Sequence, residues 1–195
     1  MKQLVIATHN AGKLEEFRAF LAPLGFEVVS AAALSLPEPT ETAPDFAGNA
    51  RIKAVAAARA SGLPALGDDS GLCVSALNGQ PGVYSARYAA DDYPGAFAKI
   101  IAAADAKDNW EAYFTCALCL AQPDGTTATY IGKAAGRIAP APRGQGGFGY
   151  DPIFIPDGYE QSYAELGAEK DRISHRARAF EQIAAALADV QNLRP

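Results

Sequence analysis

The sequence predicts a mixed α/β fold, because strand-like runs and helical patterns alternate along the chain. Residues 4–7 form a short apolar run typical of a buried strand, and residues 14–21 follow with apolar side chains at helical spacing. An alanine-rich helix is expected over residues 45–61, where the first aspartate is a good N-cap. Residues 110–120 and 126–131 flank a Pro-Asp-Gly turn, which predicts an antiparallel hairpin that could form a second lobe.

Shorter elements are predicted between these. Residues 26–30 and 153–155 have the pattern of short strands, and residues 94–104 have that of a helix opened by proline. The proline-rich residues 34–44 are expected to form a loop. Residues 83–88, which carry one arginine between two tyrosines, are expected to form another.

Length and composition favour one globular domain. A chain of 195 residues with 49% hydrophobic content can bury a full core. This length favours a single domain, with either one lobe or two. A net charge of -5 argues against nucleic acid or an anionic membrane as the main partner. The apolar run at the start is too short for a signal peptide, and no run reaches membrane-spanning length, so a cytoplasmic protein is expected.

The three cysteines do not suggest a disulfide framework. Cys116 and Cys119 have the spacing of a redox or zinc motif, but they lie in a predicted strand. Residues three apart on a strand face opposite sides, so this pair cannot share a metal. We therefore expect both to be small buried apolar residues.

Residues 8–13 (THNAGK) join the first predicted strand to the first predicted helix. Backbone N–H groups at a helix N-terminus favour anions, and Lys13 adds a full positive charge, so this turn is a candidate phosphate site. It has too few glycines for a Walker loop. The alternative is that Asn10 caps the helix and Lys13 is a solvated side chain.

Two adjacent carboxylates, Asp68 and Asp69, lie in the stretch 67–72 (GDDSGL) between apolar segments. We expect them where one strand-like run ends and another begins, with side chains on opposite faces, so that only one faces a given cleft. An aspartate at a strand end can hold a hard cation or take a proton from water. The alternative is a polar turn, since Asp, Ser and Gly dominate turns.

The glycine-rich residues 140–152 are the least globular-looking part of the chain. Phe148 and Tyr150 in this stretch could stack on a planar base. The alternative is a flexible linker with two anchoring aromatic rings. His175 and Arg176 are expected in the first turn of the last helix, where basic residues oppose the helix dipole. That unfavourable placement favours a ligand-facing role, and the alternative is an exposed pair on the surface.

Taken together, these motifs resemble the inosine triphosphate pyrophosphatase family, and its bacterial members most. They occur in the family's order along nearly the whole chain: residues 8–13, Asn49 with Lys53, residues 67–72, 85–88 and 147–152, Lys170, and residues 174–176.

The resemblance implies a fold and an activity. The fold is a long twisted mixed central sheet flanked by helices, in a single domain of residues 1–195 with two lobes and a nucleotide cleft between them. The protein would be a homodimer. The activity is the hydrolysis of non-canonical purine nucleoside triphosphates (ITP, dITP and XTP) to the monophosphate and pyrophosphate, with Mg²⁺ as cofactor.

The resemblance also implies roles for individual residues. Asp69 would be the catalytic base and a metal ligand, and Glu41 is the best candidate for a second metal ligand, with Glu38 behind it. The residues that would contact the substrate are Thr8, His9, Asn10, Ala11, Gly12 and Lys13 in the triphosphate loop, Lys53, Ser70, then Phe148, Gly149, Tyr150 and Asp151 around the base, and Lys170, His175 and Arg176 in the purine pocket.

Two features depart from the family pattern. Gly48 stands where glutamate is common, which weakens the helix start and removes one carboxylate. Residues 40–44 (TETAP) replace a common run of two glutamates, threonine and glycine. Glu41 is the acid of this altered loop.

The chemistry fits these residue types. Water attacking the α-phosphorus needs a carboxylate to remove its proton, while Mg²⁺ and lysines neutralise charge on the departing pyrophosphate. The donors of Arg176 suit the 6-oxo acceptor of a purine and would face the 6-amino donors of adenine. Two alternatives stay open: a pyrophosphatase for other modified or pyrimidine nucleotides, and a non-catalytic nucleotide-binding module that would not need Asp69.

Overall fold

The computed structural model describes residues 2–192, which divide into two compact units, and each unit combines separate parts of the chain. Unit 1 consists of residues 2–69, 116–132 and 179–192, and unit 2 consists of residues 70–115 and 133–178.

Six strands form a mixed sheet in the order β2-β1-β3-β4-β5-β6. β1 pairs in parallel with β2 and β3, whereas β5 pairs antiparallel with β6. The predicted mixed α/β fold is therefore confirmed. The strands are β1 (Lys2–Ala7), β2 (Phe26–Ser30), β3 (Ala65–Val74), β4 (Glu111–Ala121), β5 (Thr127–Ile138) and β6 (Phe154–Pro156).

The strands β3, β4 and β5 each contribute residues to both units. The expectation that the β4–β5 hairpin forms a second lobe is wrong, because the boundary between the units crosses β4 after Thr115 and β5 after Gly132. β5 also continues to Ile138, well past the expected end near residue 131. The hairpin therefore supplies core strands to each unit.

Helices follow the sequence pattern closely. The α-helices are α1 (Ala11–Leu21), α2 (Phe46–Ser61), α3 (Ser85–Ala89), α4 (Tyr93–Ala106), α5 (Tyr163–Leu166), α6 (Lys170–Ile173) and α7 (His175–Asn192). Short 3-10 helices cover Ala22–Leu24, Ser75–Leu77, Gly82–Tyr84, Asp151–Ile153 and Gly167–Glu169. The predicted helices over 14–21, 45–61 and 94–104 are confirmed. Among the described residues, no helix is long and apolar enough to span a membrane.

The loop expected at residues 83–88 is instead helical, so that prediction was wrong. A 3-10 turn leads into α3, and the side chain of Ser85 joins this segment to β3. Its Oγ donates to the carbonyl of Gly82 at 2.7 Å and accepts the N–H of Leu72 at 2.9 Å. A partner so distant in sequence leaves no local pattern.

The acidic stretch was expected at the junction of two strand-like runs, but it lies within the single ten-residue strand β3. The turn preference of its residues is overridden by tertiary packing. A Cβ added to Gly67 would overlap the backbone of α2 at Ala50, so glycine is required for the close approach of helix and strand. Both acids are buried: Asp68 is 2% and Asp69 is 5% exposed.

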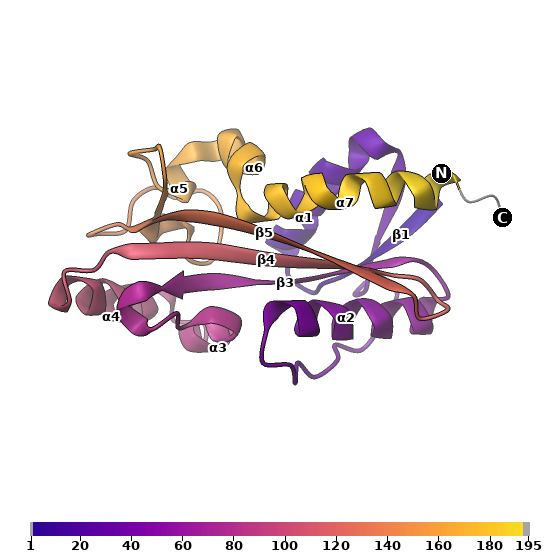
Figure 1. The fold of residues 1–195 in the computed structure, drawn as a ribbon, viewed down its shortest axis with the longest axis horizontal. Helices are drawn as coiled ribbons and strands as arrows, with labels where there is room; N and C mark the ends of the chain where they lie inside the picture. Colours follow the sequence, from indigo (N-terminus) through magenta and orange to yellow (C-terminus); the bar gives the residue numbers. More distant parts are fainter. Residues whose placement is uncertain (1, 193–195) are drawn as a thin grey trace. The chain divides into compact units, whose positions relative to one another are not determined.

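The core of unit 1 covers both faces of its strands. On one face, apolar side chains of β1, β3 and β4 pack against α1 and α7, and on the other the alternate residues pack against the alanine-rich α2. Figure 1 shows α2 on one side of these strands, with α1 and α7 on the other. Cys116 and Cys119 belong to opposite faces, as predicted. Both are buried free thiols, as is Cys73.

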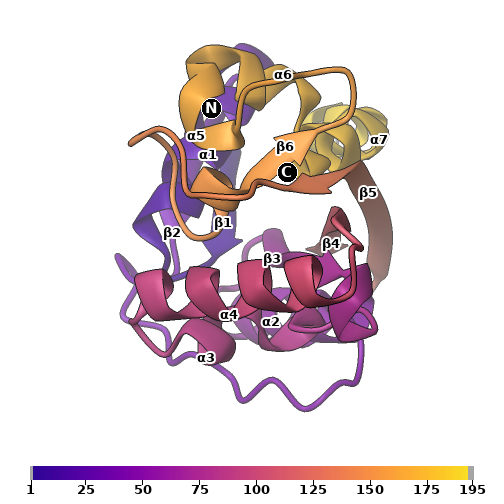
Figure 2. The same ribbon diagram turned by 90° about the vertical axis from the view of Figure 1, so that its left-hand side faces the viewer.

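In unit 2, the core forms where α4 packs on the strands. Phe97 and Ile100 of α4 cluster with Leu72, Phe114 and Phe154. Figure 2 shows α4 beside the short α3. This core supports the glycine-rich loop, since Tyr150 is part of the same cluster.

Candidate active site

The turn between β1 and α1 is held by its own side chains. Thr8 Oγ1 accepts the N–H of Asn10 at 3.1 Å, and Asn10 Oδ1 accepts the N–H of Lys13 at 3.0 Å. Asn10 is therefore the N-cap of α1, as one of the two sequence interpretations expected, and Ala11 and Gly12 form its first turn. The other part of that interpretation, a solvated Lys13, is wrong because its ammonium contacts the buried carboxylate of Asp68.

Asp68 and Asp69 face opposite sides of β3, as the strand pattern predicted. Asp68 meets Lys13 and accepts a hydrogen bond from Cys116 Sγ at 3.1 Å. Asp69 turns to α2, where its Oδ1 lies 3.1 Å from Lys53 Nζ. Each carboxylate thus has a lysine partner from a different element.

Lys53 joins two carboxylates. Its ammonium lies 2.7 Å from Glu41 Oε1 as well as 3.1 Å from Asp69 Oδ1. The other Asp69 oxygen accepts from Asn49 Nδ2 at 3.3 Å. Glu41 comes from the loop between β2 and α2, so loop, helix and strand converge on one ion-pair cluster.

Burial and charge shift the titration of this cluster. Burial raises the pKa of the Asp69 carboxyl, and the charges of Lys53 and Lys13 only partly offset this. Burial lowers the pKa of Lys53, but the neighbouring carboxylates, led by Asp69, outweigh it, so this pKa is raised and the side chain stays cationic. Lys13 contacts Asp68, the neighbour of Asp69 in β3, so its charge also acts on the Asp69 carboxyl and lowers its pKa.

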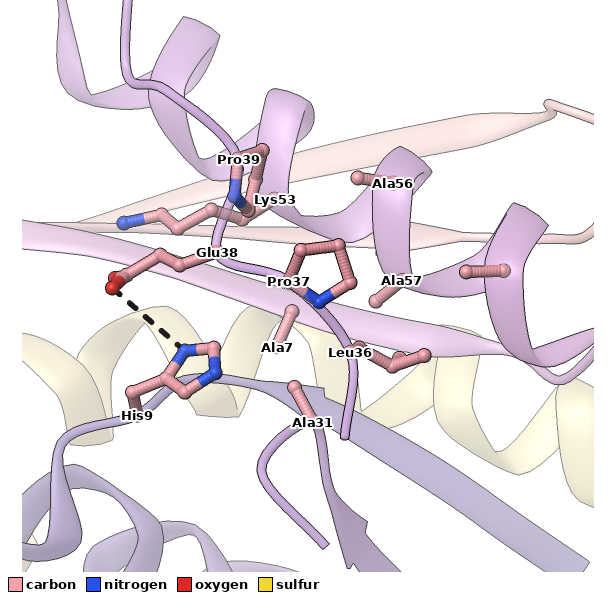
Figure 3. Close-up of a pocket in the computed structure, with 11 residues that line it drawn as sticks. Ala7, His9, Ala31, Leu36, Pro37, Glu38, Pro39, Lys53, Ala56 and Ala57 are labelled. Atoms are coloured by element: carbon pink, nitrogen blue, oxygen red, sulfur yellow. Dashed lines mark ion pairs between the residues drawn. The ribbon is translucent and has the colours of Figure 1, made fainter. Parts of the chain in front are cut away.

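A small cavity of about 50 Å³ lies beside this cluster (Figure 3). His9 and Glu38 face each other at its edge, with His9 Nδ1 3.9 Å from the carboxylate, and Lys53 lies on the same side. The remaining lining is apolar: Ala7, Ala31, Leu36, Pro37, Pro39, Ala56, Ala57 and Ala60. Glu38 is therefore oriented to the loop of residues 8–13, whereas Glu41 reaches Lys53.

The glycine-rich loop in unit 2 is anchored by a buried carboxylate. Asp151 accepts the N–H of Phe148 at 2.8 Å and the ammonium of Lys170 at 2.7 Å. Lys170 also lies over the Phe148 ring, 4.6 Å from its centroid. These contacts argue against the flexible-linker interpretation, and the positive φ of Gly149 lets the loop turn between Phe148 and Tyr150.

Tyr150 belongs to the core of unit 2. It is 4% exposed, and its hydroxyl donates to the carbonyl of Ser85 at 2.7 Å. Burial raises the pKa of this phenol, so it stays neutral. Phe148, which is half-buried, is thus the ring of this loop that a ligand can reach.

His175 and Arg176 are buried at the start of α7. Arg176 is only 1% exposed, and its Nη2 donates to Ser70 Oγ at 2.9 Å. The His175 ring stacks on Phe114 with centroids 4.6 Å apart and an interplanar angle of 12°. Tyr163 is nearly parallel to the same ring, at 18°.

The structure brings together residues that sequence reasoning did not single out for a role. Asn49 appeared in a motif only, and Phe114 and Tyr163 were not singled out at all. Asn49 contacts Asp69 across 20 positions of sequence, and Phe114 contacts His175 across 61. The only sequence signal was the polar Asn49 within an otherwise alanine-rich helix.

Comparison with known proteins places these motifs in a family. The sequence profile of the Ham1 family matches residues 4–186. A dITP/XTP pyrophosphatase of Gluconobacter oxydans is 53% identical over 181 residues, which cover 91% of this chain and 87% of that protein. The solved structure of a HAM1 protein from Coxiella burnetii is 39% identical, with a TM-score of 0.87, over 97% of this chain and 100% of that chain. The Staphylococcus aureus Ham1 protein is 35% identical, with a TM-score of 0.85 and the same coverage.

The resemblance drawn from the ordered motifs is thus confirmed by profile, relatives and solved structures alike. The match runs over nearly the whole chain and includes both the lysine-carboxylate cluster of unit 1 and the buried basic pair of unit 2. The chain belongs to the Ham1 family.

Proposed function

We propose that this protein hydrolyses non-canonical purine nucleoside triphosphates, among them ITP, dITP and XTP, to the monophosphate and pyrophosphate. The observation that carries the proposal is the cluster in unit 1, where Lys53 pairs with both Asp69 and Glu41. This hydrolysis needs positive charges that bind the phosphate groups and a carboxylate that removes a proton from the attacking water. The cluster contains both, and its Asp69 carboxylate is buried. The name of the Gluconobacter relative, a dITP/XTP pyrophosphatase, supports the same substrate class.

In the proposed reaction, a water oxygen bonds to the α-phosphorus while the bond to the oxygen that bridges to the β-phosphate breaks. The electron pair leaves with pyrophosphate, and the proton of the water passes to Asp69. Because burial raises the pKa of Asp69, this carboxylate is a stronger base than an exposed aspartate.

The two lysines would bind the phosphate oxygens. Lys13 stands in the first turn of α1, where backbone N–H groups also favour anions, and Lys53 extends from α2. Their positive charges would offset the negative charge that gathers on pyrophosphate as it leaves. Asn10, as the cap, keeps the loop in the conformation that presents Lys13.

The donor set fits Mg²⁺. In nucleotide enzymes this ion binds through one or two carboxylates, waters and substrate phosphates rather than through a cage of protein ligands. Asp69 and Glu41 would hold it, since both already share one ammonium group. Within residues 2–192, no group of three or more His, Cys, Asp or Glu side chains is arranged so that it could hold a metal ion. When bound, Mg²⁺ would neutralise charge on the phosphates.

Base recognition is proposed for the basic residues of unit 2. Arg176 is buried and its Nη2 is held by Ser70 Oγ, so the direction of its guanidinium group is fixed. Guanidinium donors can bind the 6-oxo group of hypoxanthine or xanthine and would meet the amino donors of adenine unfavourably. Lys170, His175 and Phe148 would complete the pocket, with Phe148 stacking on the base.

Replacing Arg176 by methionine should lower the preference for ITP over ATP, expressed as the ratio of kcat/KM values, by at least about tenfold. The loss should fall on ITP, because a hydrogen bond to its 6-oxo group disappears. Arg178→Met is the matched control, since this exposed arginine on the same helix donates to the carbonyl of Lys133. An unchanged ratio in a folded Arg176→Met variant would remove this explanation of selectivity.

Product analysis with ITP and Mg²⁺ tests the function as a whole. We expect IMP and pyrophosphate in equal amounts, with far slower turnover of ATP and GTP. Release of single phosphate would overturn the proposed attack on the α-phosphorus. Faster turnover of modified pyrimidine triphosphates would indicate the related pyrophosphatase, and binding without turnover would indicate a non-catalytic module.

The proposal includes a homodimer in the cytoplasm. Light scattering on the pure protein should then give twice the chain mass of 20.3 kDa. A mass equal to one chain would remove the dimer from the proposal without affecting the chemistry.

A further inference from the structure

Asn49 makes two hydrogen bonds that connect different parts of unit 1. Its Oδ1 accepts the N–H of Ala43, on the loop that carries Glu41, at 3.0 Å. Its Nδ2 donates to Asp69 Oδ2 at 3.3 Å. The orientation of the amide is chemically determined, because a backbone N–H can only donate and a carboxylate accepts. Asn49 is 2% exposed, so water does not compete readily for these bonds.

Lys53 repeats this connection one helical turn later. Positions four apart lie on the same face of a helix, and Lys53 contacts Asp69 on one side and Glu41 on the other. The two Asp69 oxygens are therefore held separately, Oδ1 by Lys53 and Oδ2 by Asn49. The loop is likewise held at two points, Ala43 and Glu41.

Gly48 allows the loop to lie this close to α2. A Cβ added to this glycine would overlap the Cβ of Ala43. The helix start itself does not require glycine, since Asp45 caps it by accepting the N–H of residue 48 at 2.7 Å. Helix propensity alone would favour alanine there. The glycine is thus explained by the approach of the loop.

We propose that Asn49 is a positioning residue that sets the distance and orientation between Asp69 and the Glu41 loop, and that Gly48 makes this contact possible. The inference rests on the proposed function for the roles of Asp69 and Glu41. A larger residue at position 48 then pushes away the loop that carries Glu41. Gly48 thus contributes to the geometry of the site, and its presence is more than the loss of the glutamate that is common at this position.

Paired substitutions at positions 43 and 48 test the contact. Gly48→Ala should lower kcat for ITP by about 10- to 100-fold, as for other residues that orient metal ligands. The double variant Ala43→Gly/Gly48→Ala removes the overlap and should recover most of that loss. KM should change less than kcat, because neither residue is among the proposed substrate contacts. Full activity of Gly48→Ala, or no recovery in the double variant, would overturn the role of Gly48.

Hydrogen exchange at the Ala43 amide gives a readout that does not depend on activity. Protection of this N–H should fall in Asn49→Ala and Gly48→Ala, and should return in the double variant. Asn49→Asp should keep the protection, since a carboxylate still accepts from Ala43, yet it should lose kcat because it repels Asp69. These results would hold even if the substrate were not a purine nucleotide.

Asn109→Ala is the matched control for the asparagine. Its Oδ1 also accepts a backbone N–H, from Glu111 at 3.2 Å, but it lies in unit 2 outside the proposed site. It should leave kcat and Ala43 protection unchanged. If Asn49→Ala keeps wild-type kcat and wild-type Ala43 protection while folded, the proposal is wrong.

Discussion

Asp69→Asn is expected to lower kcat for ITP by about 1000-fold while nucleotide binding stays within a few fold of wild type. Asparagine keeps the shape of the side chain and can still meet Lys53, but it cannot take a proton from water. Because Asp69 lies on the α2 face of β3 and Asp68 on the other, its neighbour cannot substitute for it.

Turnover is measured by pyrophosphate release with Mg²⁺, and binding by calorimetry on the variant, which hydrolyses the ligand only slowly. Asp105→Asn, an exposed acid on α4, is the control and should behave as wild type. Wild-type turnover in Asp69→Asn would mean that another group activates the water. Loss of binding together with turnover would assign Asp69 to substrate binding instead.

Lys53→Met should both inactivate and destabilise the protein. The side chains of Lys53, Asp69 and Glu41 are 9%, 8% and 23% exposed, so removal of the ammonium leaves two carboxylates facing each other with little water. Breaking a buried pair in this way lowers the free energy of unfolding by about 3 kcal/mol. The pKa of Asp69 should rise further, because its principal opposing charge disappears.

Denaturant unfolding with and without Mg²⁺ checks this expectation. If Asp69 and Glu41 hold the ion, Mg²⁺ should raise the free energy of unfolding more in Lys53→Met than in the wild type, because it supplies the missing positive charge. Lys99→Met, at an exposed position of α4, is the control. An equal Mg²⁺ effect in both proteins would argue against metal binding by this pair.

Local patterns predicted the elements well. Asn10 and Asp45 cap their helices through bonds to residues three positions on, and such signals are visible in a short stretch of sequence. The alternation of side chains along a strand correctly predicted that Asp68 and Asp69 lie on opposite faces of β3. What depends on neighbours in sequence was therefore accessible without a structure.

Contacts between distant residues were not accessible in this way. The strand continues through Asp68 because Lys13, 55 positions earlier, neutralises its charge, and no turn signal in the stretch reports that partner. Phe114 is a second example. Its ring stacks on His175, and nothing in the apolar pattern of the strand reports this contact with the basic pair at positions 175 and 176. Tyr150 was predicted to stack on a planar base from the glycine-rich loop, but it is buried and its hydroxyl donates to the carbonyl of Ser85 in the core.

The buried thiols described above provide built-in probes of local unfolding. Cys73 lies in unit 2, whereas Cys116 and Cys119 lie in unit 1, on opposite faces of the strand β4. All three are 5% exposed or less. A thiol reagent can react with each only when its surroundings open. The modification rate at each sulfur, followed by mass spectrometry, therefore measures how often each part of the native protein opens, with no label engineered into the chain.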